Sequence, residues 1–368
     1  MKSLFIALGV YAGVGGLERF NQRVVRCLAE MGSSGGLESR IVALWDTPEQ
    51  AIRTPRVARC MPGASSKVRT AARFLWHAWR MQPDVILYGH VLLSPLAPLA
   101  RLLSPRSRHL LFVHGREVWL APFRSRIPPW ERLAVGHWID RVAAVSRLTA
   151  ARMGQAYGLP ESRFHILPNA VDAPPESCRA NEPNRPTQEL RLLTVTRLGR
   201  QDRYKGCDKV IRAMPRVLSE VPGARYHLVG DGPLRPELER LSGELGVRDQ
   251  VRFHGYVDDR ALERIYEEAH LLVMPSSGEG FGIVFLEAWK HGLPVIVGNH
   301  DASAEVVTHG VNGLCVDPES VPEIAQAVLT LLKDRGKARA MGQRGYQTVL
   351  ERYTHDDFRR TLAGMLQA

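Results

Sequence analysis

The sequence lacks long apolar runs, paired cysteines and the usual nucleic-acid-binding modules. None of its apolar stretches reaches the roughly 18 residues that a membrane-spanning helix requires. Only five of the 368 residues are cysteine. They are scattered and show no metal-ligand spacing: Cys27, Cys60, Cys178, Cys207 and Cys315. This usage predicts reduced thiols in a cytoplasmic protein and excludes a disulfide scaffold or a zinc site, and the missing modules exclude a nucleic-acid partner.

The first residues imitate a short signal peptide without continuing as one. Lys2 is followed by the apolar run LFIALGVYAG, which matches the start of a secretory leader. The run has only the length of a strand, however, and a glycine loop and a helical pattern follow it at once. We therefore interpret Ser3–Leu8 as a buried strand.

What the sequence does contain is typical of a globular chain. Hydrophobic residues make up 45% and charged residues 24% of the chain. Since 368 residues exceed one ordinary core, two domains are expected.

The net charge of +11 belongs to the first half of the chain. Residues 1–185 hold 25 Lys and Arg against 13 Asp and Glu, whereas residues 186–368 hold 24 against 25. Basic surfaces attract phosphorylated substrates and anionic lipid headgroups. The first half is therefore expected to meet a phosphorylated acceptor or an anionic membrane surface, the latter as a peripheral protein on the inner face of the plasma membrane.

Short apolar runs alternate with helical patterns along the whole chain, which predicts doubly wound α/β architecture. Four prolines between Pro174 and Pro186 mark the best linker. We expect one domain over 1–180, completed by a helix at about 353–368, and a second over 187–352. The runs interpreted as strands are Ser3–Leu8, Arg40–Trp45, Asp84–Gly89, Leu110–Gly115, Val142–Ser146, Leu190–Thr196, and those beginning at Arg225, Val251, Leu271, Pro294 and Gly313.

The segment PSSGEGFGIVFLEAWKHGLPVIVG, residues 275–298, is the most informative stretch. It follows a buried strand, and it places Glu279 at the start of a predicted helix and Glu287 about two turns further along. Glycines between them let the backbone approach a ligand closely, and a helix N-terminus favours anionic groups. In an open α/β sheet, ligands bind at this end of the strands.

Two carboxylates separated by seven residues around G-F-G resemble the signature of the family 4 retaining glycosyltransferases, which have the GT-B fold. Other segments match the same family: GVGGLER near the N-terminus, His114 after a strand, and Arg197 followed by Lys205–Gly206. The resemblance implies two Rossmann-like doubly wound domains that face each other across a crevice. It also implies transfer of a sugar from a GDP- or UDP-sugar to a hydroxyl of a glycan or lipid-linked acceptor, as in polysaccharide or glycolipid assembly.

The resemblance further implies roles for individual residues. Glu279 holds hydroxyls of the sugar, His114 contacts the transferred sugar, and Arg197 and Lys205 stabilise the diphosphate. No metal ligand and no cofactor are implied, because no D-x-D-type acidic motif stands in a matching place. The residues implied to line the donor site are Gly15, Gly16, Asn169, Gly230, Tyr256, Val257, Gly280, Phe281, Gly282, Ile283 and Glu287, of which Glu287 accepts from the ribose.

Several alternatives remain at this level. A double displacement, as in retaining glycosidases, would use the two carboxylates differently, although the ribose assignment of Glu287 favours front-face attack. A sugar-nucleotide epimerase or a non-catalytic nucleotide-sugar-binding subunit could share the two-domain plan, but the two spaced glutamates argue against both. Finally, residues 67–82 fit either a helix that covers a sheet or a basic helix on a membrane surface.

Overall fold

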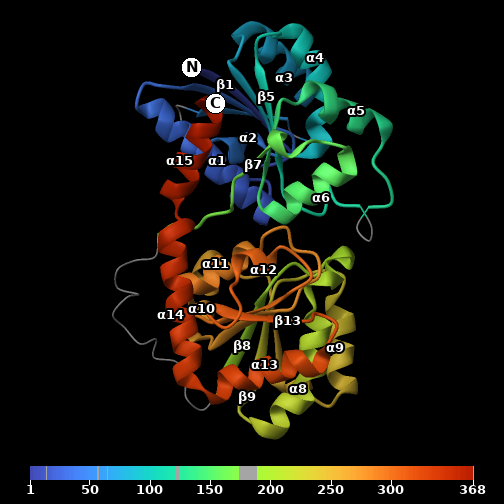
Figure 1. Cartoon of the computed structure of the whole chain (residues 1–368), viewed down its shortest axis with the longest axis vertical. Helices are drawn as coiled ribbons and strands as arrows, with labels where there is room; N and C mark the ends of the chain where they lie inside the picture. The colour runs from blue at the N-terminus through green and yellow to red at the C-terminus, as the bar shows by residue number, and fades with distance from the viewer. Residues whose placement is uncertain (14, 56–57, 64, 121–123, 174–188, 368) are drawn as a thin grey trace. The chain divides into compact units, whose positions relative to one another are not determined.

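The computed structural model describes residues 1–13, 15–55, 58–63, 65–120, 124–173 and 189–367, so the proposed linker Pro174–Pro186 lies outside the described residues. The chain divides into two compact units. Unit 1 comprises Met1–Asn169 and His355–Ala368, and unit 2 comprises Ala170–Thr354. Each unit is an α/β structure built on its own sheet (Figure 1).

The sheet of unit 1 is entirely parallel, in the order β3-β2-β1-β4-β5-β6-β7. Its central strands are apolar and buried on both faces, as parallel sheets covered by helices require. The strands are β1 (Lys2–Ala7), β2 (Glu38–Ala43), β3 (Ala58–Pro62), β4 (Val85–Tyr88), β5 (Arg108–Val113), β6 (Arg141–Ala144) and β7 (Phe164–Ile166).

Helices cover this sheet, and the last of them comes from the far end of the chain. In α15, Phe358 and Leu362 are buried, and the helix packs beside α1 (Figure 1). The helices of unit 1 are α1 (Gly16–Ser33), α2 (Pro48–Ala51), α3 (Lys67–Met81), η1 (Val91–Leu96), α4 (Ala97–Leu103), α5 (Pro129–Trp138), α6 (Arg147–Tyr157), η2 (Glu161–Arg163) and α15 (His355–Gln367). No helix of the described residues is long and apolar enough to cross a membrane.

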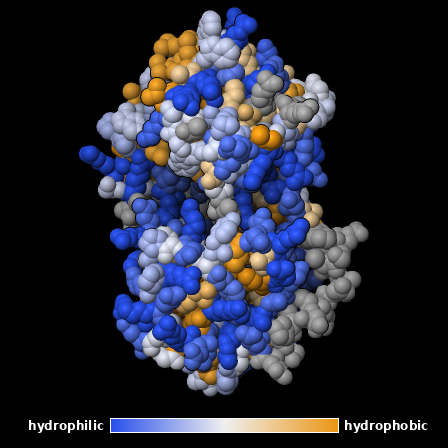
Figure 2. Space-filling model, turned by 180° about the vertical axis from the view of Figure 1, so that it is seen from behind, coloured by the Kyte–Doolittle hydropathy of each residue, from blue (hydrophilic) through white to orange (hydrophobic). Residues whose placement is uncertain are grey.

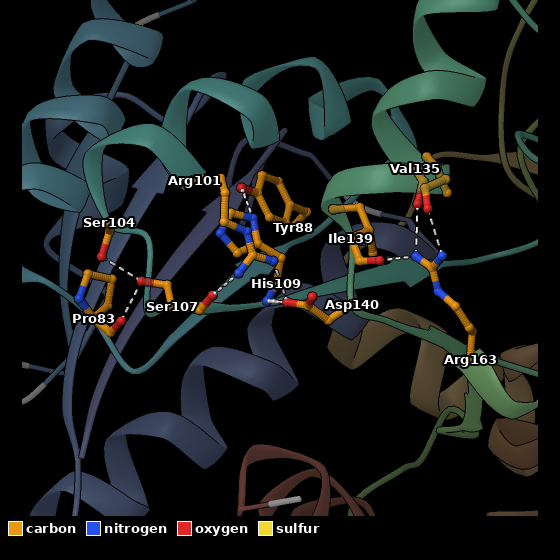
Figure 3. Close-up of polar contacts among 11 residues, drawn as sticks. Pro83, Tyr88, Arg101, Ser104, Ser107, His109, Val135, Ile139, Asp140 and Arg163 are labelled. Carbon is orange, nitrogen blue, oxygen red and sulfur yellow. Dashed lines mark hydrogen bonds and ion pairs between the residues drawn. The ribbon is translucent and has the colours of Figure 1, made fainter.

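Polar groups of α4, β4 and β5, and of the residues just before β5 and β6, form hydrogen bonds with one another (Figure 3). Arg101 donates to Ser107 O and to the Asp140 carboxylate, over 2.7 and 2.6 Å. Asp140 also accepts from the backbone N–H of His109 over 2.7 Å, and the His109 ring bonds Tyr88 Oη over 3.0 Å. These hydrogen bonds indicate that the residues have a structural role.

Unit 2 repeats the same strand order without the seventh strand, as β10-β9-β8-β11-β12-β13. All of its strands are parallel. They are β8 (Leu190–Val195), β9 (Ala224–Val229), β10 (Val251–Gly255), β11 (Leu271–Met274), β12 (Val295–Gly298) and β13 (Gly313–Val316).

The core of unit 2 forms where the apolar faces of its helices pack on this sheet. Met214, Leu241 and Val328 are among the buried residues that join the helices to the strands. The helices are η3 (Arg200–Lys205), α8 (Cys207–Glu220), α9 (Arg235–Glu244), η4 (Arg248–Gln250), α10 (Asp259–Glu268), α11 (Ile283–Lys290), α12 (Ser303–Val306), α13 (Val321–Lys333) and α14 (Arg335–Arg352).

Both sheets have one position where neighbouring strands lead to opposite sides. In unit 1 this switch point lies between β1 and β4, and in unit 2 it lies between β8 and β11. Loops that leave the carboxyl ends of these strands diverge, and open α/β sheets bind ligands at such points.

Candidate active site

The loops after β8 and β11 carry the charged residues of unit 2. Arg197 follows β8 by two residues and is exposed. The longer loop that begins there folds as η3 and ends with Lys205. Glu279 stands in the loop between β11 and α11, with 9% of its surface exposed. The topology therefore brings three charges, distant in sequence, to one switch point.

Lys205 and Glu279 form a direct ion pair. Their side chains are 16% and 11% exposed, so both charges are largely removed from water. The pKa of Lys205 is lowered to about 8, chiefly by burial and also by the nearby Arg197, while Asp202 and Asp301 oppose the shift. A buried cation with a single close counterion can exchange that partner for another anion.

Close backbone contacts hold the two loops together. The Ser277 N–H donates to Tyr204 O over 2.9 Å. Gly206 adopts φ +74°, and a Cβ at this position would clash with Pro275 O. Only glycine allows this approach, so the Gly206 next to Lys205 is explained by packing against the loop that carries Glu279.

Asp301, beyond the end of β12, fixes the backbone of Glu279. Its Oδ2 accepts from Glu279 N–H over 2.7 Å and from Ser276 Oγ over 2.8 Å, while Oδ1 accepts from Ser303 N–H over 2.9 Å. Asp301 is 4% exposed, and burial raises the pKa of its carboxyl. The sequence reasoning missed this residue, because a single polar residue beyond a buried strand has no motif around it.

The turn after β9 shapes the loop that carries Arg197. Gly230 has φ +128°, and a Cβ there would clash with Thr196 O. The Leu198 N–H then donates to Asp231 O over 3.0 Å. Gly230 therefore supports the loop of Arg197 through backbone contact with it.

The segment that follows Glu279 leads into α11. Gly280, Phe281 and Gly282 are buried, and Gly282 forms the N-cap with φ +85°. Phe281 makes an edge-to-face contact with Tyr353, with ring centroids 5.6 Å apart. Ile283 opens the helix, whose first N–H groups point back toward the loop of Glu279 and favour an anion.

Glu287 lies on the second turn of α11, and its Oε2 accepts from Tyr266 Oη over 3.0 Å. Tyr266 is buried and stacks on His291, with ring centroids 5.2 Å apart. This carboxylate is therefore held by α10 rather than by the Lys205–Glu279 pair. Tyr256 and Val257 follow β10; Tyr256 is 70% exposed and Val257 is half-buried.

In unit 1, His114 follows β5 directly. Its backbone N–H donates to the Glu117 carboxylate, and its Nε2 bonds Gly89 O over 3.0 Å. The ring also packs edge-to-face on Phe20, with centroids 4.8 Å apart. Since a carbonyl only accepts, Nε2 carries a proton, and in the neutral ring Nδ1 is then an acceptor.

The glycine loop after β1 is largely satisfied by a carboxylate of the chain itself. Asp46 is buried, and its Oδ1 accepts from the N–H groups of Val10 and Ala12 over 2.8 and 3.2 Å. Backbone N–H groups gathered in this way form an anion-binding nest, which Asp46 fills. Gly15 and Gly16 lie beyond it, at the N-terminus of α1.

Asn169 is half-buried at the boundary between the two units. The structure thus brings Lys205 and Glu279 into contact and sets Arg197 near them, while Glu287 lies on the second turn of α11 and is bonded to Tyr266. Within the described ranges, no three His, Cys, Asp or Glu side chains come together as a metal site.

Two Rossmann-like sheets in one chain, with cations and a carboxylate at the switch point of the second, define a GT-B glycosyltransferase. Residues 14–173 match the family model for Glycosyltransferase Family 4, and residues 180–348 match that for Glycosyl transferases group 1. The chain belongs to glycosyltransferase family 4, as its resemblance to that family predicted.

Relatives with similar sequences support this assignment. The chain is 37% identical over 289 residues to the GDP-mannose-dependent alpha-(1-6)-phosphatidylinositol monomannoside mannosyltransferase of Mycobacterium tuberculosis, covering 75% of this chain and 73% of the relative. The protein of the same name from Mycolicibacterium smegmatis is 34% identical, with 71% and 70% covered.

Solved structures with the same fold extend over the whole chain. HepE of Anabaena, in complex with UDP and glucose, superimposes with a TM-score of 0.80 at 18% identity, covering 100% of this chain and 99% of that one. Sucrose-phosphate synthase from Thermosynechococcus elongatus gives 0.77 at 20% identity, with 100% and 98% covered. These likenesses confirm the predicted fold class.

Proposed function

We propose that the chain transfers a hexosyl group, with retention of configuration, from a nucleotide-diphosphate sugar to a hydroxyl of a glycan or lipid-linked acceptor. GDP-mannose is the first donor to consider, because the mycobacterial relatives are named as GDP-mannose-dependent. The observation that carries the proposal is the buried Lys205–Glu279 pair beside Arg197.

The pair explains how unit 2 would accept a diphosphate. Without donor, Glu279 neutralises Lys205. A bound diphosphate supplies a stronger anion, so Lys205 turns to the phosphate and Glu279 becomes available to sugar hydroxyls. Arg197 adds a guanidinium suited to forked contacts with phosphate oxygens. The chain's own cations then neutralise the diphosphate, and the proposed reaction requires no metal ion.

The chemical step follows from where charge develops. The bond between the anomeric carbon and the β-phosphate oxygen breaks, and its electron pair stays on the leaving diphosphate. Lys205 and Arg197 stabilise that charge, and the N-terminus of α11 contributes its N–H groups. The acceptor oxygen forms the new bond on the same face of the sugar, and its proton goes to the leaving phosphate oxygen. Glu279 supports the positive charge on the sugar without forming a bond to it.

A donor panel tests this function. The purified chain is incubated with GDP-mannose, GDP-glucose, UDP-glucose and UDP-N-acetylglucosamine, and release of the nucleoside diphosphate is measured with methyl α-mannoside or phosphatidylinositol vesicles as acceptor. We expect one donor to be consumed in the presence of EDTA, with an α-linked product. An inverted product, or a trapped glycosyl adduct on Glu279, would contradict the proposed mechanism.

We also propose that unit 1 binds an anionic membrane surface on which a lipid-linked acceptor is presented. Trp76 and Trp79 of α3 are 53% and 56% exposed, and Leu102 of the adjacent α4 is 79% exposed. Figure 2 shows apolar residues gathered at the upper left of the view, on unit 1. Arg69 and Arg80 of α3 are exposed as well. Aromatic and basic residues on one helix are typical of interfacial membrane binding.

Co-sedimentation with vesicles tests the membrane proposal. Vesicles of phosphatidylcholine with 30% phosphatidylglycerol should bind the chain, and binding should fall as salt rises because surface attraction is screened. The double variant Trp76→Ala, Trp79→Ala should weaken binding, whereas Val311→Ala, an exposed apolar residue of unit 2, should not. Equal binding to pure phosphatidylcholine would contradict an electrostatic contribution.

A further inference from the structure

The carboxyl end of β4 carries a histidine, His90, to which the assignments above give no role. β4 borders β1 at the switch point of the unit 1 sheet, and Gly89 and His90 follow its last residue, Tyr88. The Gly89 N–H donates to Ile6 O over 2.8 Å, and a Cβ at Gly89 would lie 3.1 Å from the Phe5 ring. His90 therefore leaves the sheet at the point where open α/β sheets bind ligands.

The protonation of His90 is set by its contacts. Its Nδ1 accepts from the Leu92 N–H over 3.1 Å as the N-cap of η1. Because an accepting nitrogen carries no proton, the neutral ring bears its proton on Nε2. Burial lowers the pKa of His90, which keeps the ring neutral at neutral pH. The charged and titratable groups that act on it are Glu117, Glu131, His114 and Arg124.

His90 and His114 are neighbours with opposite tautomers. Their rings are nearly parallel, at 23°, with centroids 6.4 Å apart. His114 donates from Nε2 to Gly89 O and so presents Nδ1 as an acceptor, whereas His90 presents Nε2–H as a donor. Among the described residues, neither of these remaining nitrogens has a further hydrogen-bond partner.

A buried ion pair supports the loop after β5 that carries His114 and Glu117. Glu131 is fully buried and accepts from both terminal nitrogens of Arg124, over 2.7 and 2.9 Å. Arg124 also donates to Glu117 O over 2.8 Å, and the Glu117 carboxylate holds the N–H of His114. His114 and Glu117 are thus held by hydrogen bonds of the chain itself, as a preorganised binding site requires.

We propose that His90 binds an acceptor hydroxyl by donating Nε2–H to its oxygen, beside His114, whose Nδ1 accepts from a hydroxyl of the neighbouring substrate sugar. The proposal rests on the transfer reaction proposed above. One donor and one acceptor side by side match hydroxyl groups, which do both. A phosphate diester has no proton to donate to Nδ1, so the pair favours the neutral hydroxyls of a sugar or polyol over such a phosphate.

Steady-state kinetics with the donor found in the panel, and with methyl α-mannoside and its monodeoxy derivatives as acceptors, test the assignment. We expect His90→Phe to lower kcat/KM for the acceptor by about 10- to 100-fold, the loss of one buried hydrogen bond. The KM for donor and donor hydrolysis without acceptor should stay unchanged. His90→Gln keeps an N–H donor and should recover part of the loss.

Two comparisons make the outcome decisive. One monodeoxy acceptor should be poor with the parent chain but no poorer with His90→Phe, which identifies the hydroxyl involved. His77→Gln, the same substitution on α3, serves as the control and should behave as the parent chain. Unchanged acceptor kinetics in His90→Phe, or a change confined to donor KM or hydrolysis, would overturn the assignment. A parent chain that consumes no donor would refute the proposed function instead.

Discussion

Unit 1 and unit 2 order their central strands identically but place different chemistry at the switch point. Unit 2 has a buried ion pair, Lys205–Glu279, with Arg197 nearby. Unit 1 has two imidazoles, and the carboxylate of Asp46 already fills its backbone nest. The scaffold fixes where a ligand binds, whereas the side chains beyond the strand ends decide which ligand it is. The comparison favours a diphosphate in unit 2 and neutral hydroxyls in unit 1.

The largest expected effect comes from removing the carboxylate of unit 2. Glu279→Ala should lower kcat by about 10³-fold, because support for the charge on the sugar is lost, with a modest loss of nucleotide affinity. Since the change also leaves Lys205 without its counterion, Glu279→Gln and thermal unfolding serve as checks. Glu237→Ala, on the surface, is the control. A variant that keeps most of its kcat would contradict the assigned role.

Removing either cation should have the next largest effect. Lys205→Ala and Arg197→Ala should each raise the barrier by about 2–4 kcal/mol, as for loss of a group that stabilises developing negative charge. Arg203, two residues before Lys205, pairs with Glu237 at the surface and is 61% exposed. Arg203→Ala should leave the rate nearly unchanged, because exposed ion pairs contribute little. Similar losses for Arg203 and Lys205 would mean that the loop, not the charge, matters.

Glu287 should affect donor binding more than chemistry. Glu287→Ala should weaken the affinity for the nucleoside diphosphate by about 10- to 100-fold, the usual loss for a hydrogen bond to a charged group, while kcat changes little. Isothermal titration with the product nucleotide measures it directly. Tyr266→Phe removes only the internal partner of this carboxylate and should have the smaller effect. If the Glu279 and Glu287 variants lost kcat and nucleotide affinity equally, the assignment of Glu279 to the chemical step and of Glu287 to donor binding would be contradicted.

The smallest expected effect is a decrease of kcat/KM for the donor at alkaline pH. Lys205 has a pKa of about 8 in the ligand-free chain, so its cationic form is lost as pH rises through 8. The kcat/KM for donor should therefore fall above pH 8, by about tenfold at pH 9, since this quantity reports groups of the free enzyme. In Lys205→Arg the guanidinium stays charged, and this decrease should disappear from the pH profile even if the rate is lower.

The central strands of both sheets could be predicted from the sequence, because central parallel strands are buried on both faces and are therefore apolar throughout. Leu271–Met274 and Leu110–Val113 are continuous apolar runs for that reason. The edge strands are different: β3 includes Arg59 and Pro62, and all three residues of β7 are only partly buried. Neither shows the apolar run of a central strand, and the sequence reasoning missed both.

The residues of the site also fall into those that the sequence could predict and those that it could not. Glu279, Arg197 and Lys205 could be proposed because motifs stand around them. Asp301 and His90 could not, since a single polar residue beyond a strand has meaning only through its neighbours in space. The ion pair itself joins residues 74 positions apart. Sequence reasoning placed both residues at one crevice but gave each a separate partner, because the pairing depends on the close contact of Gly206 with Pro275.

The position of α15 has a consequence for the order of synthesis. Phe358 packs on Phe20, with ring centroids 5.3 Å apart, and Phe20 in turn packs on His114. The contact between Phe358 and Phe20 forms only after every residue of unit 2 has been synthesised, because Phe358 follows unit 2 in the chain. Unit 1 therefore cannot complete the packing around Phe20 until unit 2 has been synthesised. The packing around Phe20, which contacts the His114 ring, is therefore completed late in the synthesis of each chain.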